Sequence, residues 1–150
     1  MYLNLFKKTQ LLPIDIETCW KFFSDPKNLS LITPPEMNFQ ILTDLPDEIY
    51  PGLIIQYKVS PILSLRMNWV TEITQARKPY YFIDEQRFGP YKFWHHQHHF
   101  KEHQDGIEMT DIVHYRIPFG FAGKMFGKIL VESQLNKIFD FREKKLKELF

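Results

Sequence analysis

The sequence predicts an α+β domain in which a curved antiparallel sheet of about seven strands wraps around a long C-terminal helix. Three observations lead to this prediction. Apolar residues alternate with polar ones through much of the middle of the chain, as they do in half-buried strands. Two short helical segments come between the first strand and this region. The chain ends with a longer segment of helical period, whose apolar face can cover one side of the sheet.

The first part of the chain is predicted to form one strand and two short helices. Residues 2–10 have the pattern of a strand. Asp15 follows a proline and provides an N-cap for the first helix. Asp25 and Pro26 predict the start of a second helix, because Asp25 can cap it and the φ angle of the following proline is already helical. This second helix is expected to run to about Ile32. The apolar face of the first helix consists of Ile16, Cys19, Trp20 and Phe23.

Two strands are predicted from alternation in residues 52–59 and 65–74. The residues assigned to their inner face are Leu53, Ile55, Tyr57, Val59, Leu65, Met67, Trp69 and Ile73. Residues 80–88 also resemble a strand, but both of its faces mix apolar and charged side chains. The orientation of this strand therefore stays open.

The last two strands, residues 93–102 and 107–117, are predicted to form a hairpin through Asp105 and Gly106, a pair that favours the positive φ angles of a tight turn. The expected pairs are Phe100–Asp111, His98–Val113, His96–Tyr115 and Trp94–Ile117. The inner face is then Trp94, His96, His98, Phe100, Met109, Asp111, Val113, Tyr115 and Ile117. A two-residue slip would keep this division, whereas a one-residue slip would expose Trp94 or bury Arg116.

Residues 125–150 are predicted to form one long amphipathic helix. Its apolar positions are Ile129, Leu135, Ile138, Phe139, Leu146 and Leu149. Residues 118–123 lead into it, and we expect this segment, with Phe119, Phe121 and Phe126, to act as a hinge or lid. Its glycines lack the lysine–serine/threonine pair of a phosphate loop and the spacing of a dinucleotide site. No cofactor is therefore expected.

Composition limits the classes of function. The chain has 150 residues, which fit a single domain spanning 1–150. Lys plus Arg number 19 and Asp plus Glu number 18, so the formal charge of +1 provides no basic field for nucleic acid. Aromatic residues make up 16% of the chain, and such large apolar surfaces must be buried or meet a ligand.

The sequence also favours a cytoplasmic protein. Its single cysteine, Cys19, cannot form an internal disulfide, and the N-terminus lacks the pattern of a secretion signal. No segment approaches the roughly 18 to 20 apolar residues that a spanning helix needs. We therefore expect no integral membrane association.

Two segments resemble a known superfamily. They are residues 13–29, with PID, WKFFSDP and KNL, and residues 84–100, with DEQRFGPY and WHHQHHF. Both are similar to the SRPBCC superfamily of START lipid-transfer domains, plant pathogenesis-related allergens and polyketide cyclases. They most resemble its bacterial cyclase/dehydrase-like group of ligand-binding SRPBCC domains, which is also similar to a domain found beside epimerase-like domains. The resemblance covers essentially the whole chain.

The resemblance implies a helix-grip fold with a deep cavity between the concave sheet and the long helix. Across the superfamily this cavity holds sterols, lipids, polyketides and other apolar molecules. An epimerase-like partner is a further implication. The resemblance implies no single activity, because function belongs to the residues that line the cavity.

The candidate ligand-binding residues are Tyr57, Met67, Trp69, Trp94, His96, His98, Asp111, Tyr115 and Phe126. Four of them are polar residues on the inner face: His96, His98, Asp111 and Tyr115. An unsatisfied buried polar group costs about 1–3 kcal/mol, so each should have a partner. They form either an internal network or a site that orients the polar end of an apolar ligand.

A metal site is less favoured by the sequence. His96 and His98 project from one face with Asp111 diagonally across, and three such donors could hold zinc with one position open. Adjacent residues on one face of a strand are roughly 6.5–7 Å apart, however, and no cysteine is near. We therefore predict no metal and no catalytic residue, and we expect Cys19 to be buried core.

The sequence thus predicts a protein that binds or transports a hydrophobic small molecule of lipid, sterol or polyketide type. One alternative is a small cyclase or dehydratase in which an inward histidine tuned by Asp111 transfers a proton. Another is an accessory domain whose interior is filled by its own side chains. Enzymatic activity is the less favoured of these interpretations.

Overall fold

The predicted α+β architecture is confirmed by the structure, a computed structural model that describes residues 2–61, 65–118 and 127–150. The elements along the chain are β1 (Asn4–Leu12), α1 (Ile16–Ser24), η1 (Pro26–Ser30), η2 (Pro35–Met37), β2 (Gln40–Ile41), β3 (Ile54–Val59), β4 (Met67–Arg77), β5 (Tyr81–Phe88), β6 (Phe93–His103), β7 (Gly106–Arg116) and α3 (Lys128–Leu149). The seven strands form one sheet in the order β1-β7-β6-β5-β4-β3-β2, and every pair of neighbours is antiparallel.

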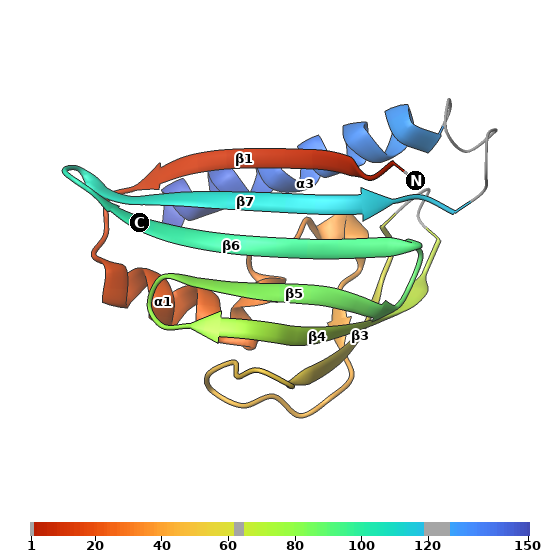
Figure 1. Ribbon diagram of the computed structural model, residues 1–150, viewed down its shortest axis with the longest axis horizontal. Coiled ribbons are helices and arrows are strands. Elements are labelled where there is room, and N and C mark those ends of the chain that lie inside the picture. The colour runs from red at the N-terminus through yellow and green to blue at the C-terminus, as the bar shows by residue number, and fades with distance from the viewer. Residues whose placement is uncertain (1, 62–64, 119–126) are drawn as a thin grey trace.

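The helices lie on one side of this sheet (Figure 1). The long helix α3 runs along β1 and β7, and the short helix α1 lies behind the other half of the sheet. This arrangement is the helix grip expected from the order of the elements. Among the described residues, no helix combines the length and the apolar character needed to cross a membrane.

The two short helices begin at the residues predicted to cap them. The Asp15 carboxylate accepts a hydrogen bond of 2.8 Å from the backbone N–H of Thr18 at the start of α1. The Asp25 carboxylate accepts one of 3.0 Å from the N–H of Lys27 at the start of η1. The second segment is a 3₁₀ helix that ends at Ser30, earlier than predicted.

The hairpin between β6 and β7 has the predicted faces but a different register. Its turn consists of Gln104 and Asp105, and Gly106 pairs with His103 inside the ladder. The predicted pairs were therefore wrong by two residues: His98 lies opposite Asp111, His96 opposite Val113 and Trp94 opposite Tyr115. Because the slip is even, every side chain keeps its predicted face.

The close approach of β1 explains why the glycine lies inside the strand. Gly106 has a φ of 134°, and a Cβ atom there would overlap the carbonyl oxygen of Leu12. Only glycine avoids both the strained backbone and this overlap. The local sequence pattern assigned Gly106 to the turn because nothing in that pattern shows that Leu12 lies beside it.

The orientation of β5, left open by the sequence, is settled by its neighbours. Phe82 and Asp84 face the interior, and Asp84 pairs with His96 across the β5–β6 ladder. An acidic residue thus lies on the concave side of the sheet, where the alternation pattern gave no clear sign of it.

The interior is packed unevenly. Beneath α3, the β7 residues Val113 and Tyr115 are fully buried against Val131, Leu135 and Phe139 of the helix. Phe6 of β1 adds a ring contact to Phe139 with centroids 4.7 Å apart. The interior is hollow over β3, β4, β5 and β6, and Leu135 and Phe139 of α3, which contact β7, also form part of the wall of this hollow.

Part of the sequence prediction lies outside the described residues. The expected hinge or lid falls on residues 119–126, and so do Phe119, Phe121 and Phe126. The predicted start of the last helix, residue 125, also lies outside the described residues. In the described part of the chain, α3 runs from Lys128 to Leu149.

Candidate functional site

A cavity of about 170 Å³ lies between the concave face of the sheet and the helices. The sheet contributes residues from β3, β4, β5 and β6, and the other walls come from α1, η1, η2 and α3. Most of the lining is apolar. It includes Phe22, Phe23, Leu29, Ile32, Met37, Phe39, Ile49, Ile55, Val59, Ile73, Phe82, Tyr91, Leu135, Ile138 and Phe139.

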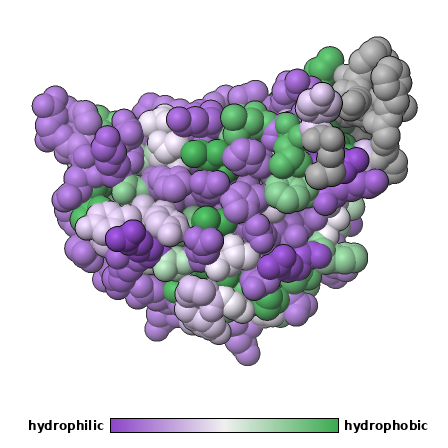
Figure 2. Space-filling model, viewed as in Figure 1, coloured by the Kyte–Doolittle hydropathy of each residue, from purple (hydrophilic) through white to green (hydrophobic). Residues whose placement is uncertain are grey.

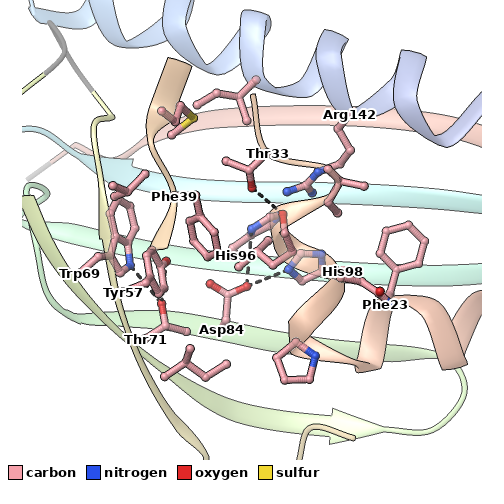
Figure 3. Close-up of a pocket in the computed structure, with 18 of the residues that line it drawn as sticks. Phe23, Thr33, Phe39, Tyr57, Trp69, Thr71, Asp84, His96, His98 and Arg142 are labelled. Atoms are coloured by element: carbon pink, nitrogen blue, oxygen red, sulfur yellow. Dashed lines mark hydrogen bonds and ion pairs between the residues drawn. The ribbon is translucent and has the colours of Figure 1, made fainter. Parts of the chain in front are cut away.

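Aromatic rings form one end of the cavity (Figure 3). Trp69 stacks on Tyr57 with centroids 5.9 Å apart and meets the edge of Trp94 at 5.3 Å. The Trp69 indole N–H donates to the Thr71 hydroxyl at 3.0 Å, and the Tyr57 hydroxyl lies 3.3 Å from the same oxygen. A buried indole or phenol usually needs such a partner. These contacts fix the rings and satisfy their polar atoms.

Five charged or polar side chains meet beside the middle of the cavity and are called here the polar cluster: Asp84, His96, His98, Asp111 and Arg142. They come from four elements, β5, β6, β7 and α3. Strand alternation places both histidines on the inner face of β6. Arg142 reaches the cluster from α3, and Figure 3 shows its guanidinium next to His96.

The two histidines lie between the two carboxylates. His96 Nε2 is 2.8 Å from Asp111 Oδ1, and its Nδ1 is 3.6 Å from Asp84 Oδ2. His98 Nε2 is 2.8 Å from Asp84 Oδ2, and its Nδ1 is 3.1 Å from Asp111 Oδ1. Each imidazole therefore presents one nitrogen to each carboxylate.

Arg142 completes the cluster from the helix side. Its Nη1 is 3.3 Å from Asp111 Oδ1, so one carboxylate oxygen is shared by both histidines and the arginine. The guanidinium also lies over the Phe139 ring, 4.7 Å from its centroid. The Nε atom of Arg142 is buried and has no hydrogen-bond partner among the described residues.

Packing holds the imidazoles in these positions. The rings of His96 and His98 have centroids 3.8 Å apart, and the Phe82 ring stacks on His98 at 4.1 Å. The edge of Phe139 contacts His96 at 5.8 Å. Aromatic faces thus surround the two histidines and leave them little freedom to rotate.

The carboxyl groups remain ionised in spite of their burial. Burial alone would raise the pKa of Asp111, but the bonds with His96 and His98 and the charge of Arg142 hold its pKa far below the usual range. Burial likewise opposes ionisation of Asp84, but its contacts with His96 and His98, together with the charge of Arg142, lower its pKa.

The two histidines differ from one another. Burial, and then the charge of His98, lowers the pKa of His96. Burial also disfavours the charged form of His98, but its contacts with Asp111 and Asp84 outweigh burial and raise its pKa. With His98 protonated and His96 neutral, two carboxylates are balanced by two cations, His98 and Arg142. The cluster then has no net charge, as a buried ionic group requires.

The structure brings five of the predicted ligand-binding residues to the cavity: Tyr57, Trp69, Trp94, His96 and His98. Asp111 and Tyr115 are not part of its lining, because α3 covers β7 directly and Asp111 lies behind the histidines. Met67 is half-buried where the β3–β4 ladder ends, and it does not line the cavity either. Phe126 lies outside the described residues.

Asp84 and Arg142 belong to the cluster but were not predicted from the sequence. Asp84 lies on the strand whose faces could not be told apart, and only the β5–β6 register shows that it meets the histidines. Arg142 had a detectable signal. It is three residues after Phe139 and four before Leu146, so a charge interrupts the buried stripe of α3.

His95, His99 and His114 lie on the outer face of β6 and β7, as the predicted division of the two strands into faces implies. His95 Nδ1 is 2.6 Å from Glu85, and Gln97 connects His95 to His99 through contacts of 3.2 and 2.9 Å. Figure 2 shows this face of the sheet as mostly hydrophilic. Substitutions of these outer histidines can therefore serve as controls for experiments on His96 and His98.

Cys19 is unsuited to nucleophilic chemistry. Cys19 belongs to α1, and its side chain is fully buried in the hydrophobic core. Burial, with a smaller effect of Asp15, raises the pKa of its thiol to about 12. The reactive thiolate is therefore scarce at neutral pH.

Comparison with known proteins shows the fold and no function. No protein-family profile matches the sequence. No curated protein matches it either. Among solved structures, protein Ms6760 from Mycobacterium smegmatis has 15% sequence identity and a TM-score of 0.68, over 100% of this chain and 99% of that one. TTHA0849 from Thermus thermophilus has 10% identity and a TM-score of 0.69, over 97% and 99%.

A longer protein contains the same fold. The nucleoside-diphosphate sugar epimerase from Corynebacterium glutamicum has 20% identity and a TM-score of 0.66. The match covers 95% of this chain but only 28% of the epimerase chain. At these identities the likeness concerns the fold alone.

Proposed function

We propose that the protein binds a compact, largely apolar small molecule in the cavity between the sheet and α3. The observation that carries the proposal is a hollow with apolar and aromatic walls that has one polar cluster at its side. Binding sites for small molecules have this composition: apolar surface supplies affinity, and a few fixed polar groups orient the ligand.

The volume narrows the class of ligand. A cavity of about 170 Å³ is close to the roughly 150 Å³ that holds one benzene molecule, and is smaller than the roughly 300–1,000 Å³ typical of sites for drug-sized ligands. The proposed ligand therefore has about one or two rings. A sterol or a long acyl chain, which the family resemblance includes, would require the cavity to enlarge.

The polar cluster indicates how the ligand is oriented. Arg142 lines the cavity, and its buried Nε–H lacks an acceptor among the described residues. Leaving such a donor unpaired is costly, particularly on a charged group. The proposed ligand carries an oxygen acceptor, such as a carbonyl, a phenol or a carboxyl group, and places it beside Arg142 and the histidines.

The alternatives from the sequence have less support. An interior filled by its own side chains disagrees with the hollow above β3, β4, β5 and β6. A cyclase or dehydratase would use the same histidines, but both nitrogens of each ring already face carboxylates, which leaves neither ring a nitrogen directed at a ligand. Membership of the SRPBCC superfamily, an epimerase-like partner and a cytoplasmic location also stay predictions. The match in fold to the epimerase supports the first two of these.

Nuclear magnetic resonance of the full chain tests the proposal. We expect p-cresol and 2-naphthol to shift the indole N–H signals of Trp69 and Trp94 in a saturable manner, since both rings line the cavity. Ile55→Phe places a ring into the hollow and should abolish the shifts. The matched control is Ile54→Phe, because Ile54 is the preceding residue of β3 and is exposed. Shifts that are absent in the wild type, or unchanged in Ile55→Phe, would refute the proposal.

A further inference from the structure

We propose that Asp84, His96 and His98 bind a divalent transition-metal ion, with its open coordination position facing the cavity. This inference goes beyond the proposed function, because an apolar molecule could bind in the cavity with or without the ion. It rests on where the donor atoms lie, on the residues behind them and on the charge of the cluster.

The donor atoms of the three residues converge. One ligand atom from each lies within 4.8 Å of the other two. Bond lengths of about 2.1 Å in a tetrahedral site separate neighbouring donors by about 3.4 Å. The distance from His96 Nδ1 to Asp84 Oδ2, 3.6 Å, already fits. The distance from His98 Nε2 to Asp84 Oδ2 is 2.8 Å, so that pair would have to separate by roughly half an ångström to admit the ion.

The sequence analysis argued against a metal site because of the backbone spacing between the two histidines, but their rings converge. The backbone positions of His96 and His98 are separated by one residue along β6, a spacing of roughly 6.5–7 Å. Their rings nevertheless lean together, with centroids 3.8 Å apart. The third donor comes from Asp84 on β5 rather than from Asp111, the candidate that the sequence pattern suggested.

Asp111 occupies the position expected of a supporting residue. Its Oδ1 lies 2.8 Å from His96 Nε2 and 3.1 Å from His98 Nδ1, the two ring nitrogens that do not face Asp84. Histidine ligands commonly donate their second N–H to a carboxylate, which fixes the tautomer and the ring orientation. Here His96 Nε2 makes this hydrogen bond with Asp111. His98 Nδ1 lies within ion-pair distance of the same oxygen but without hydrogen-bond geometry, and Arg142 holds that oxygen at 3.3 Å.

The charges in the cluster call for a cation at the same point. Asp84 and Asp111 contribute two negative charges and Arg142 one positive charge. A buried net charge is unfavourable unless it is compensated. The net charge of −1 is compensated by a cation between Asp84 and the two histidines; a divalent ion carries one charge more than is needed, so the open position would take an anionic fourth donor.

The donor set favours a particular class of ion. Two imidazoles and one carboxylate suit zinc, iron and cobalt better than magnesium or calcium, which prefer oxygen donors. All three ligands line the cavity and Asp111 does not. Three protein ligands leave room for a fourth donor on the cavity side.

Calorimetric titration of tag-free, chelator-treated full-length protein with ZnCl₂ tests the proposal, together with the absorption spectrum after addition of Co²⁺. We expect one Zn²⁺ per chain and Co²⁺ d–d bands of low coordination number. Loss of a supporting partner typically costs 10–100-fold in affinity, so Asp84→Asn, which removes a ligand, should weaken Zn²⁺ binding by about 100-fold or more.

The matched control is the double substitution His95→Gln and His99→Gln on the outer face of the same strand, which should leave Zn²⁺ affinity unchanged. Because Asp84→Asn could disturb folding, circular dichroism and the melting temperature are measured for each variant with and without Zn²⁺. We expect Zn²⁺ to raise the melting temperature of the wild type and of the outer-face control, and not that of Asp84→Asn.

Three outcomes would overturn the metal site. They are no Zn²⁺ binding by the wild type, equal affinity in Asp84→Asn, and loss of binding in the outer-face control. If the wild type binds no Zn²⁺ but p-cresol still shifts its Trp69 and Trp94 signals, the cavity binds its ligand without a metal ion. The two proposals therefore fail independently.

Discussion

Asp84 Oδ2 lies 2.8 Å from His98 Nε2, although the residue opposite Asp84 across the β5–β6 ladder is His96. The contact is diagonal. Since Asp84 is also 3.6 Å from His96 Nδ1, one side chain of β5 contacts both inner histidines of β6. Both strands belong to the hollow half of the sheet, and His98 connects this pair to the packed half because its Nδ1 lies 3.1 Å from Asp111 of β7.

The buried carboxylate of Asp111 should contribute far more to stability than an exposed one. Asp111 is 2% exposed and contacts His96, His98 and Arg142. Asp111→Asn should therefore lower the free energy of unfolding by about 3–5 kcal/mol, because it leaves buried cations uncompensated. The measurement is urea denaturation at neutral pH.

The control for that experiment is Asp140→Asn. Asp140 pairs with Lys8, but its side chain is 69% exposed. Exposed pairs contribute about 0–1 kcal/mol, so its loss should be small. Similar losses in the two variants would show that the polar cluster does not stabilise the fold.

Gly106→Ala should destabilise the protein more than Gly52→Ala. Both glycines have positive φ, 134° and 95°, so alanine is strained at either position. At Gly52 the added methyl group meets open space, whereas at Gly106 it overlaps the backbone of Leu12. We expect a loss of about 1 kcal/mol at Gly52 and a clearly larger loss at Gly106, measured by the urea midpoint. Equal losses would contradict the observed register of the hairpin.

Thr71→Val should cost about 1–3 kcal/mol although the two side chains have nearly the same shape. The substitution removes the oxygen that accepts from the Trp69 indole and contacts the Tyr57 hydroxyl. A buried N–H is then left without an acceptor. Thr110→Val is the control, because Thr110 bonds Thr9 in an exposed position on the outer face. If both variants unfold at the wild-type denaturant concentration, the Trp69–Thr71 bond contributes nothing.

Cys19 should resist alkylation in the folded protein. Burial raises the pKa of its thiol to about 12, and the side chain has no exposed surface. A raised pKa leaves only a small fraction of thiolate at pH 8. Iodoacetamide at pH 8 should therefore leave the native chain unmodified and add one group in guanidinium chloride, as measured by intact mass. Rapid modification of the native protein would place the thiol at the surface.

The sequence predicted the elements whose pattern is local. Alternation assigned the faces of β6 and β7 correctly, and it did so even though the register was wrong, because a two-residue slip preserves the face of each side chain. The caps at Asp15 and Asp25 were equally local and were confirmed.

Features that depend on contacts between distant elements could not be predicted in this way. Neither face of β5 is apolar throughout, so only its pairing with β6 shows that Asp84 meets His96. The position of α3 over β7 also depends on contacts between distant elements. It buries Tyr115 and separates this residue from the cavity. The charge of Arg142 within the α3 stripe was the one local sign of the cluster that went unused.

The central claim is that an apolar hollow above β3, β4, β5 and β6 accepts a compact guest. A crystal of the full chain pressurised with xenon tests it most directly, since dry apolar cavities of this size bind xenon. We predict a xenon peak among Ile55, Ile73, Phe82 and Phe139, which line the cavity. An interior without xenon, with these side chains packed against one another, would contradict the claim.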